Sequence, residues 1–503
     1  MRLAVIVTAL TLLSACASTV SPRTPDGGAE ASCTSCDGRC VETQCDPSNC
    51  GACGMACDSG EICDTGHCRA PAPTLLWARQ FHASYGGGYA LVATASGDVI
   101  VSGSVLGPAD LGAGPTSGGV RGDPVLVRYR NADGSVQWAR RFGSPQSDAT
   151  AYTSIALDAT ENLWGAGTFA YLADVGGPSL HAGSFLGGLL GHYDPAGNYS
   201  FAMTFTNPPD RSIGSSPDNR FGAVGTATDG DALVGGYFEG PAILGNETLA
   251  HVNGGPDGIV ARIGPHGEVR WRRILSATGS ATVRSMVVDS DGNSFVTGIF
   301  AGTSTWGNPH VSLGSFDTVI VRLDHQGTPI WSASFGGAGD DLPTAIARDD
   351  GGNLYLTGTT DRGIVAGTDT LAGSGMYVVS LTASGTFRWS RLFVGTVRPE
   401  GIAVDRGGNV AVVGNFSGAF DLAAQSFTDN GHTQGFAALL APNGEPRWSH
   451  AFAAGGDVAI NAVAADRCGG LALAGSFAAR LDLTGATLTA TGSSDGFVGL
   501  WRE

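Results

Sequence analysis

The sequence has few charged residues and, after its first residues, no long hydrophobic run. Only 15% of its 503 residues are charged, and 78 are glycine. No long amphipathic helix stands out in such a composition, so a helical protein is disfavoured. Beyond the N-terminal leader, no stretch is apolar enough to cross a bilayer as a helix. The formal net charge of −17 argues against binding to nucleic acid, because phosphates require clustered cationic side chains.

Linear signatures of metal-dependent catalysis are also missing. The ten histidines are scattered, with neither H-E-x-x-H nor H-x-H spacing, so the local signal of a metalloprotease is absent. An isolated histidine such as His192 or His266 is expected at a strand end or in a turn. We therefore predict no catalytic residue from the sequence.

One structural unit is repeated seven times, and an aromatic residue opens each copy. These residues are Trp77, Trp138, Phe201, Trp271, Trp331, Trp389 and Trp448, which are 61, 63, 70, 60, 58 and 59 residues apart. Such a nearly constant period indicates tandem copies of one unit. In the copy from Trp331 to Leu381, an aromatic segment is followed by three further apolar segments, with Gly-rich loops and turns between them. Each copy therefore predicts four short strands.

The length and spacing of these segments favour strands over helices. Trp331 and Phe335 are four residues apart, so both aromatic side chains lie on one face of an extended chain. A helix would also align them. However, the apolar runs are only about five to seven residues long, contain many Val, Ile and aromatic residues, and end at Gly, Asp and Asn clusters, as strands do. We therefore predict an all-β protein.

Packing requirements predict how the units assemble. A four-stranded unit cannot bury both of its faces alone, and closing such units in a ring leaves only short, protected edges. We therefore predict a β-propeller of seven four-stranded blades over residues 75–503. The segment F-G-G-A-G-D-D-L-P-T-A-I-A-R-D-D-G-G-N-L-Y-L-T-G (Phe335–Gly358) resembles the bacterial seven-bladed β-propeller repeat family. The resemblance implies this fold and no particular chemistry.

The order of strands within a copy predicts how the ring closes. If the A-I-A-R-D strand is innermost, the aromatic strand that ends the copy is the outermost strand of the same blade. The strand Trp77–Phe81 then has no blade before it, and the last copy lacks its outer strand. We predict that this first strand completes the last blade, because an open edge beside exposed aromatic side chains would favour aggregation.

The N-terminus resembles a bacterial lipoprotein leader. An arginine precedes the apolar run Leu3–Leu13, which is too short to span a membrane, and the run ends in L-S-A-C at residues 13–16. This tetrapeptide resembles the lipobox. The resemblance implies a signal peptide over residues 1–15 and acylation of Cys16, while Ala17 in place of aspartate implies the outer membrane. A secretory signal peptide without lipidation is the alternative.

A tether and a cysteine-rich module follow the leader. Residues 16–32 are rich in Ser, Thr, Pro and Gly, as flexible linkers are. The module, residues 33–69, contains nine cysteines. They are Cys33, Cys36, Cys40, Cys45, Cys50, Cys53, Cys57, Cys63 and Cys68. Two C-x-x-C pairs would suit zinc in a cytosolic protein, but export and the small size of the segment favour disulfides. The module also resembles a cassette of bacterial lipoproteins that has no enzymatic role.

The cysteine count predicts one further disulfide. Nine cysteines cannot all pair with one another, and outside the leader and the module the chain contains only Cys468. This residue lies in the predicted hairpin turn between the first two strands of the last copy. A free surface thiol is unusual in an exported protein, so we predict a disulfide between Cys468 and a cysteine of the module.

Acidic residues precede the innermost strand in five of the copies. They are Asp148, Asp218, Asp340, Asp341, Glu400 and Asp457. Loops in this position surround the mouth of a propeller's central channel, where carboxylates would attract cations or basic partners, including calcium, which prefers oxygen ligands. The alternative, which we favour, is that each carboxylate accepts hydrogen bonds from its own loop. The segment Asp289–Asn293 begins like a calcium-binding loop but is predicted to be a hairpin turn.

These features predict a lipoprotein of the outer membrane, facing the periplasm or the cell surface, with a disulfide-rich stalk and a propeller. The propeller is expected to bind a protein or polysaccharide without catalysis, and to need no cofactor except calcium as an alternative. A second hypothesis is an enzyme, such as a hydrolase, lyase or quinoprotein, whose site combines residues from several blades. The Trp-ended segments resemble quinone-dependent dehydrogenases, although repeats there are nearer to about forty residues. A third hypothesis is a structural component of the envelope.

Replacement of Cys16 by serine tests the predicted lipid anchor. Without the thiol there is no acylation site, so we expect the variant to lose labelling by radioactive palmitate. We also expect the precursor to stay uncleaved or the protein to leave the membrane fraction. A variant that still carries label and sediments with outer membranes would show that the lipoprotein prediction is wrong.

Overall fold

The computed structural model describes residues 34–36, 39–41, 49–57, 62–64, 67–69, 74–116, 118, 122–143, 150–208, 218–252, 254–422, 425–452, 455–466 and 469–502. All regular secondary structure within these ranges is β-strand, which confirms the predicted all-β class. In the same ranges, no helix has the length and apolarity needed to cross a bilayer. Cys16, Cys33, Cys45, Asp148 and Cys468 lie outside the described residues.

Four of the sheets have four strands each, paired antiparallel in the order of the chain. They are β6 (Tyr85–Ala93), β7 (Val99–Leu106), β10 (Asp123–Tyr129) and β11 (Val136–Arg141); β16 (Asn219–Thr226), β17 (Ala232–Phe238), β20 (Asp257–Ile263) and β21 (Val269–Leu275); β22 (Ala281–Val288), β23 (Ser294–Phe300), β26 (Asp317–Leu323) and β27 (Pro329–Phe335); and β38 (Val458–Ala465), β39 (Gly470–Phe477), β42 (Asp495–Arg502) and β5 (Thr74–Phe81).

Two further sheets are larger. The six-stranded sheet contains β12 (Thr150–Leu157), β13 (Leu163–Ala173), β14 (Leu180–Tyr193), β15 (Tyr199–Thr206), β18 (Ala242–Leu244) and β19 (Glu247–Leu249). The eight-stranded sheet contains β28 (Asp341–Arg348), β29 (Leu354–Thr360), β32 (Gly375–Leu381), β33 (Phe387–Val404), β34 (Val410–Leu422), β35 (Gln425–Thr428), β36 (Gln434–Leu440) and β37 (Pro446–Phe452).

Short hairpins make up the rest of the described strands. They are β1 (Thr34–Cys36) with β2 (Arg39–Val41), β3 (Ile62–Asp64) with β4 (His67–Arg69), β8 (Ala109–Asp110) with β9 (Pro115–Thr116), β24 (Thr303–Ser304) with β25 (His310–Val311), β30 (Ile364–Ala366) with β31 (Asp369–Leu371), and β40 (Arg480–Leu483) with β41 (Ala486–Thr489).

The prediction of seven separate four-stranded sheets is wrong, because only four sheets have this form. β33 is 18 residues long, and its first part pairs with β32 whereas its second part pairs with β34. The corresponding links between β21 and β22 and between β27 and β28 are loops, whereas this link is extended chain. Val394, Thr396 and Val397 lie in this link, and β-branched residues favour an extended backbone. In the six-stranded sheet, β15 pairs in addition with the hairpin β18–β19.

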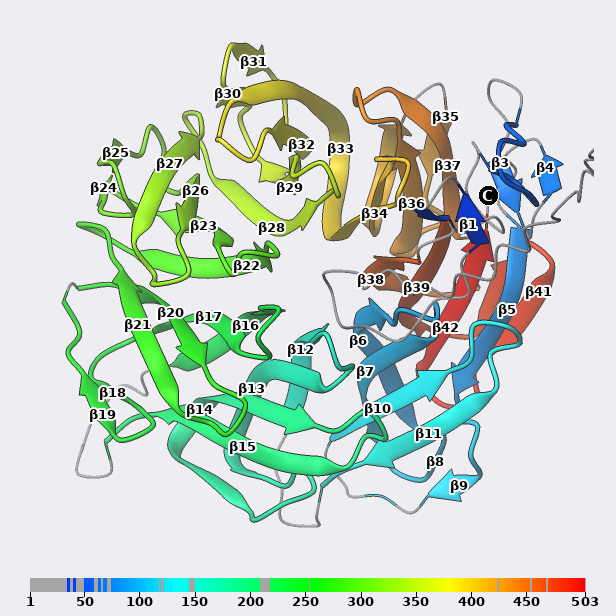
Figure 1. Cartoon of the computed structure of the whole chain (residues 1–503), viewed down its shortest axis with the longest axis horizontal. Helices are drawn as coiled ribbons and strands as arrows, with labels where there is room; N and C mark the ends of the chain where they lie inside the picture. Colours follow the sequence, from blue (N-terminus) through cyan, green and yellow to red (C-terminus); the bar gives the residue numbers. More distant parts are fainter. Residues whose placement is uncertain are drawn as a thin grey trace, which may run out of the picture.

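The sheets are arranged around a common axis as a β-propeller (Figure 1). The strands β6, β12, β16, β22, β28, the second part of β33, and β38 contact one another in this order, and β38 contacts β6. These strands surround the centre of the ring (Figure 1). The aromatic strands β11, β21, β27 and β37 come last in their antiparallel series, as the sequence predicts, whereas β15 is followed by β18.

The first strand of the ring closes it against the last. β5 pairs antiparallel with β42, so that Trp77 lies opposite Leu500 and Phe81 opposite Gly496. The two ends of the ring-forming chain are thus neighbours in one sheet (Figure 1). The aromatic rings of Trp77 and Phe81 lie 5.9 and 6.4 Å from the ring of Tyr129 in the next sheet. The predicted closure is confirmed.

The repeated tryptophan joins successive copies of the repeat. Five indole Nε1 groups donate hydrogen bonds of 2.7–3.1 Å to carbonyl oxygens in the turn before the last strand of the following copy. Four of these bonds link different sheets, and the bond of Trp389 lies within the eight-stranded sheet. The pairs are Trp77 with Asn131, Trp138 with Pro195, Trp271 with His325, Trp331 with Ala383, and Trp389 with Pro442. We call this arrangement the tryptophan–turn contact.

Each of these turns contains a glycine that the indole requires. The glycines are Gly134, Gly197, Gly327, Gly385 and Gly444, and all have positive φ. A Cβ atom at any of them would lie 2.5–2.9 Å from the indole, closer than real Cβ contacts allow. Glycine therefore provides both the left-handed backbone of the turn and the space into which the tryptophan packs.

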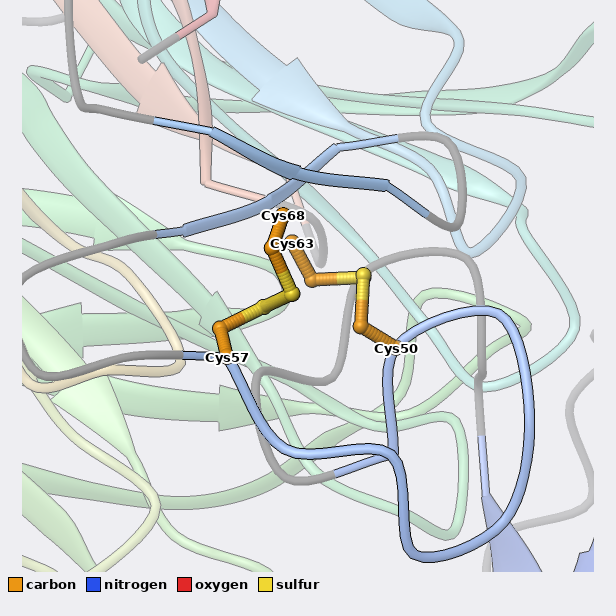
Figure 2. Close-up of a disulfide and its surroundings, with 4 residues drawn as sticks. All are labelled: Cys50, Cys57, Cys63 and Cys68. Atoms are coloured by element: carbon orange, nitrogen blue, oxygen red, sulfur yellow. A yellow bond between two sulfur atoms is a disulfide. The ribbon is translucent and has the colours of Figure 1, made fainter.

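Two disulfides are present in the cysteine-rich module (Figure 2). They join Cys50 to Cys63 and Cys57 to Cys68, and Cys53 is disulfide-bonded as well. The predicted alternative of zinc at the Cys50/Cys53 pair is therefore disfavoured. Cys36 and Cys40 lie in β1 and β2, where the structure describes the backbone only.

Two N-terminal truncations test how the ring closes. Removal of residues through Phe81 deletes β5, which exposes the edge of β42 and the aromatic cluster beside it. Removal through Arg69 deletes the cysteine-rich module and keeps β5. We expect the longer truncation to aggregate and to lose cooperative thermal unfolding, measured by size-exclusion chromatography and circular dichroism. The shorter one should remain monodisperse and cooperative. Equal behaviour of the two would contradict closure by β5.

Candidate binding site at the centre of the ring

Each innermost strand contains a β-bulge at the same place. The register with the second strand shifts across one residue, which has no residue paired opposite it. We call these the axial bulge residues: Tyr89, Thr153, Gly222, Arg284, Thr344, Glu400 and Asn461. Bulges redirect a side chain and are frequent beside functional sites. The fold therefore places one redirected residue per copy near the axis of the ring.

The axial bulge positions are accessible. All seven residues are exposed or partly exposed. At Gly222, an added Cβ atom would have no other atom within 4 Å, so this position opens onto free space. Since the other bulges occupy equivalent places on neighbouring strands, the set lines a common surface at the centre of the ring. Its members provide aromatic, hydroxyl, amide, cationic and anionic groups.

The positive charges of two arginines on other inner strands affect a third arginine, Arg284, at this surface. Burial is the largest cause that lowers the pKa of Arg284, and the positive charges of Arg398 and Arg220 lower this pKa further, whereas Tyr237 opposes them. Arg284 is nevertheless exposed to solvent. The guanidinium group of Arg220 also lies 6.0 Å from the ring of Tyr237.

Two of these arginines have carboxylate partners and the third has none. Arg220 pairs with Asp218 at 2.7 Å, and Arg398 pairs with Glu400 at 3.0 Å. Arg284 forms no ion pair or hydrogen bond with any described residue. Burial is also the main cause that raises the pKa of Glu400, against the effect of Arg398. Among the described residues, Arg284 is therefore a positive charge at the centre of the ring without a carboxylate partner.

The predicted acidic residues that the structure describes form no group of three with ligand atoms close enough to hold one metal ion. Asp218 is paired as described. The backbone N–H of Asp340 donates to Oδ1 of Asp361 at 2.7 Å, and Asp457 accepts the N–H of Thr433 at 2.9 Å. Within the described ranges, the one group of three His, Cys, Asp or Glu ligands close enough for a metal is Cys50, Cys57 and Cys68. These cysteines are disulfide-bonded. Calcium at the acidic residues stays a prediction.

Glu400 and Asp341 have different positions from those predicted. The sequence places Glu400 in a loop, but it lies at the bulge inside β33, because this link is extended. Asp341 is the first residue of β28 and is fully buried. One of its oxygens accepts the N–H of Gly337 at 2.7 Å. This interaction matches the favoured alternative, in which a carboxylate binds the backbone of its own loop.

Asp289–Asn293 forms a hairpin turn between β22 and β23, as predicted. Oδ1 of Asp289 accepts the N–H groups of Asp291 and Asn293 at 3.0 and 2.9 Å. Carboxylates that bind N–H groups two and four residues later stabilise turns. As predicted, His192 lies near the end of β14 and His266 lies in a turn.

The segment G-S-S-D-G (Gly492–Gly496) matches the sequence motif G-x-S-x-G. The G-x-S-x-G motif of serine hydrolases requires a strand before the serine and a helix after it. Here the segment leads into strand β42. The N–H of Ser493 donates to the carbonyl of Ser84 at 3.0 Å, and Asp495 accepts the N–H of Thr491 at 3.0 Å. The segment is therefore a loop held by its neighbours.

The sequence did not identify Arg284 as a site residue, although a signal is present. Arg284 is a charged residue within the apolar strand A-T-V-R-S-M-V-V. Strict alternation would assign such a residue to a solvent-exposed face. The bulge that redirects it depends on pairing with β23, which sequence periodicity does not reveal.

Comparisons with known proteins support the repeat. Residues 330–363 match the family model described as a beta-propeller repeat, in the same copy that resembled this family. Regulatory protein FlaEY of Caulobacter vibrioides is 25% identical over 203 residues, which are 38% of this chain and 20% of that protein. The chain thus matches about a fifth of the length of this relative.

Solved structures of propellers are similar at low identity. The RRP9 WD40 repeats have a TM-score of 0.46 and 8% identity, covering 86% of this chain and 99% of that one. The quinohemoprotein alcohol dehydrogenase from Comamonas testosteroni has a TM-score of 0.40 and 11% identity, covering 85% of this chain and 76% of that one. These similarities leave binding and catalysis both open.

The stability of an Asp341→Asn variant tests the burial of this carboxyl. Burial is the main cause that raises the pKa of Asp341, from 3.8 to about 6. A raised pKa means that the folded state prefers the proton, so stability is fully present below about pH 3.8 and is lost as pH rises through about 6. The difference in free energy of unfolding between variant and wild type should shift by about 2–3 kcal/mol in favour of the variant between pH 4 and pH 7. Urea unfolding measures this difference, and a pH-independent difference would contradict the effect.

Proposed function

We propose that this protein is a lipid-anchored binding protein of the bacterial cell envelope, and that its ligand binds at the centre of the ring. The ring counts as seven blades if the two halves of the eight-stranded sheet, which share β33, are counted separately. Cys16 is the proposed lipid attachment site, in the outer membrane. The disulfides at Cys50 and Cys57 support export, since such bonds persist in oxidising compartments. The ligand is a protein or polysaccharide of the envelope.

The chemical variety of the axial bulge residues carries this proposal. Positions that hold the ring together are nearly uniform among the copies, as the tryptophans and turn glycines are. In contrast, equivalent bulges carry tyrosine, threonine, glycine, arginine, glutamate or asparagine. Packing cannot explain this variety, because the positions are accessible. A rigid scaffold that displays varied polar groups is suited to recognition.

Non-catalytic binding fits these residues better than catalysis does. Nucleophilic or acid–base catalysis requires a reactive side chain held beside a base or acid of suitable pKa. The axial bulge residues include no histidine or cysteine. Their one carboxylate, Glu400, is paired with Arg398. The surface is therefore equipped to hold a polar ligand rather than to transform it.

Capture of the ligand by matched variants tests this function. Thr153 is an exposed bulge residue, so Thr153→Trp should obstruct the centre, whereas Thr153→Ser keeps the hydroxyl. Both changes are made in the full-length Cys16→Ser protein. The protein is immobilised on a resin and incubated with envelope extract. We expect one envelope component to be retained by the parent and the serine variant, with at least about tenfold less on the tryptophan variant, as hot-spot losses predict.

Two results would contradict the proposal. Equal retention by the tryptophan variant would place the binding surface elsewhere. Conversion of the captured component to a new product by the parent protein, detected by mass spectrometry, would identify an enzyme. Circular dichroism of each variant excludes a loss of binding through unfolding.

A further inference from the structure

We infer that the centre of the ring is an anion-binding site, in which Arg284, flanked by Arg220 and Arg398, binds a carboxylate or phosphate group. The inference rests on the proposed central binding surface and specifies the chemistry of its ligand. An oxyanion is the shared chemistry of acidic sugars, acidic side chains and phosphorylated groups. Guanidinium groups bind such oxyanions through parallel N–H···O hydrogen bonds.

Arg284 differs from the arginines that have structural roles. Arg128, Arg262 and Arg322 are held by carboxylates of nearby turns, with N···O distances of 3.1 Å to Asp98, 2.8 Å to Asp231 and 3.3 Å to Asp289. Within the described part of the chain, Arg284 has no such partner. The backbone bulge at Arg284 nevertheless turns its side chain to the accessible surface. An unpartnered cation at an accessible position is suited to bind an external ligand.

The local charge at Arg284 is positive although the protein is acidic overall. Two positive groups, Arg220 and Arg398, act on Arg284, and no carboxylate of the described chain is among the groups that do so. These two arginines are themselves paired with Asp218 and Glu400. The whole chain carries a formal charge of −17. A bound anion would thus be attracted by the centre of the ring and repelled by most other surfaces.

The basic residues of this chain are of the type that binds oxyanions best. The sequence contains no lysine, so all 28 of its basic side chains are arginines. Arginine presents a planar fork of donors that matches two oxygens of one carboxylate or phosphate. Tyr237 lies beside Arg220 and provides an aromatic surface with a hydroxyl donor at the edge of the arginine group.

Gly222 allows a direct test, because it is the bulge residue of the strand next to Arg284. β16 and β22 contact each other, and a side chain at Gly222 would enter free space. Its φ is outside the left-handed region, so other residues fit the backbone. Gly222→Glu should place a carboxylate beside Arg284 and imitate the ligand. Gly222→Ala is the matched control, since it adds a side chain without charge.

The experiment is calorimetric titration of inorganic phosphate and of citrate into the full-length Cys16→Ser protein at low ionic strength. We expect at least one of the two anions to bind. Arg284→Gln and Gly222→Glu should weaken its binding at least about tenfold, while Gly222→Ala should change it by less than about twofold. The anion should also raise the Tm of the parent and leave the Tm of the two charge variants unchanged.

The outcomes separate this inference from the proposed function. Absence of binding by both anions, or equal binding by Arg284→Gln, would overturn the anion site. If Thr153→Trp still blocks capture of the envelope component while Arg284→Gln captures it normally, the centre binds its ligand by other groups and only this inference fails. If Thr153→Trp has no effect on capture, the proposed function fails first.

Discussion

The tryptophan–turn contact is the interaction on which the rest of the molecule depends. An outer-strand indole donates a hydrogen bond to the turn of the following sheet and packs on a glycine in that turn. Because the contact joins successive sheets, it fixes their spacing around the axis. Trp77 makes the same contact from β5 to Asn131, so the strand that closes the ring also connects its last sheet to its first. The positions of the innermost strands, and of their bulges, follow from this fixed arrangement.

The scaffold and the central surface therefore obey different constraints. At the scaffold positions, five copies form the same bond and use the same space, so tryptophan and glycine recur. The axial bulge positions, in contrast, are accessible, and at Gly222 an added Cβ atom would have no other atom within 4 Å. The residues there differ, and one of them, Arg284, keeps a charge that no described residue neutralises. A ring built from similar units thus displays an irregular set of polar groups at its centre.

The sequence predicted the features that depend on local pattern. The aromatic period predicted the copies, and alternation and turn residues predicted the strands. The lack of an outer strand after Asp495–Arg502 predicted the closure by β5. It failed where pairing decides the outcome. The uninterrupted β33 depends on β-branched residues that replace a loop, and Arg284 reaches the central surface through a bulge set by its register with β23. Acidic residues were predicted from their charge alone, whereas in the structure Asp457 accepts the backbone N–H of Thr433 and Asp340 donates its own N–H to Asp361.

The central claim is that the ligand binds at the axis of the ring. Hydrogen exchange measured by mass spectrometry, with and without the captured envelope component, tests this claim most directly. The account predicts slower exchange in peptides that contain the bulges of β12, β16, β22 and β33, and unchanged exchange in the outer strands β11, β21 and β37. Protection confined to the outer strands or to the cysteine-rich module would contradict it.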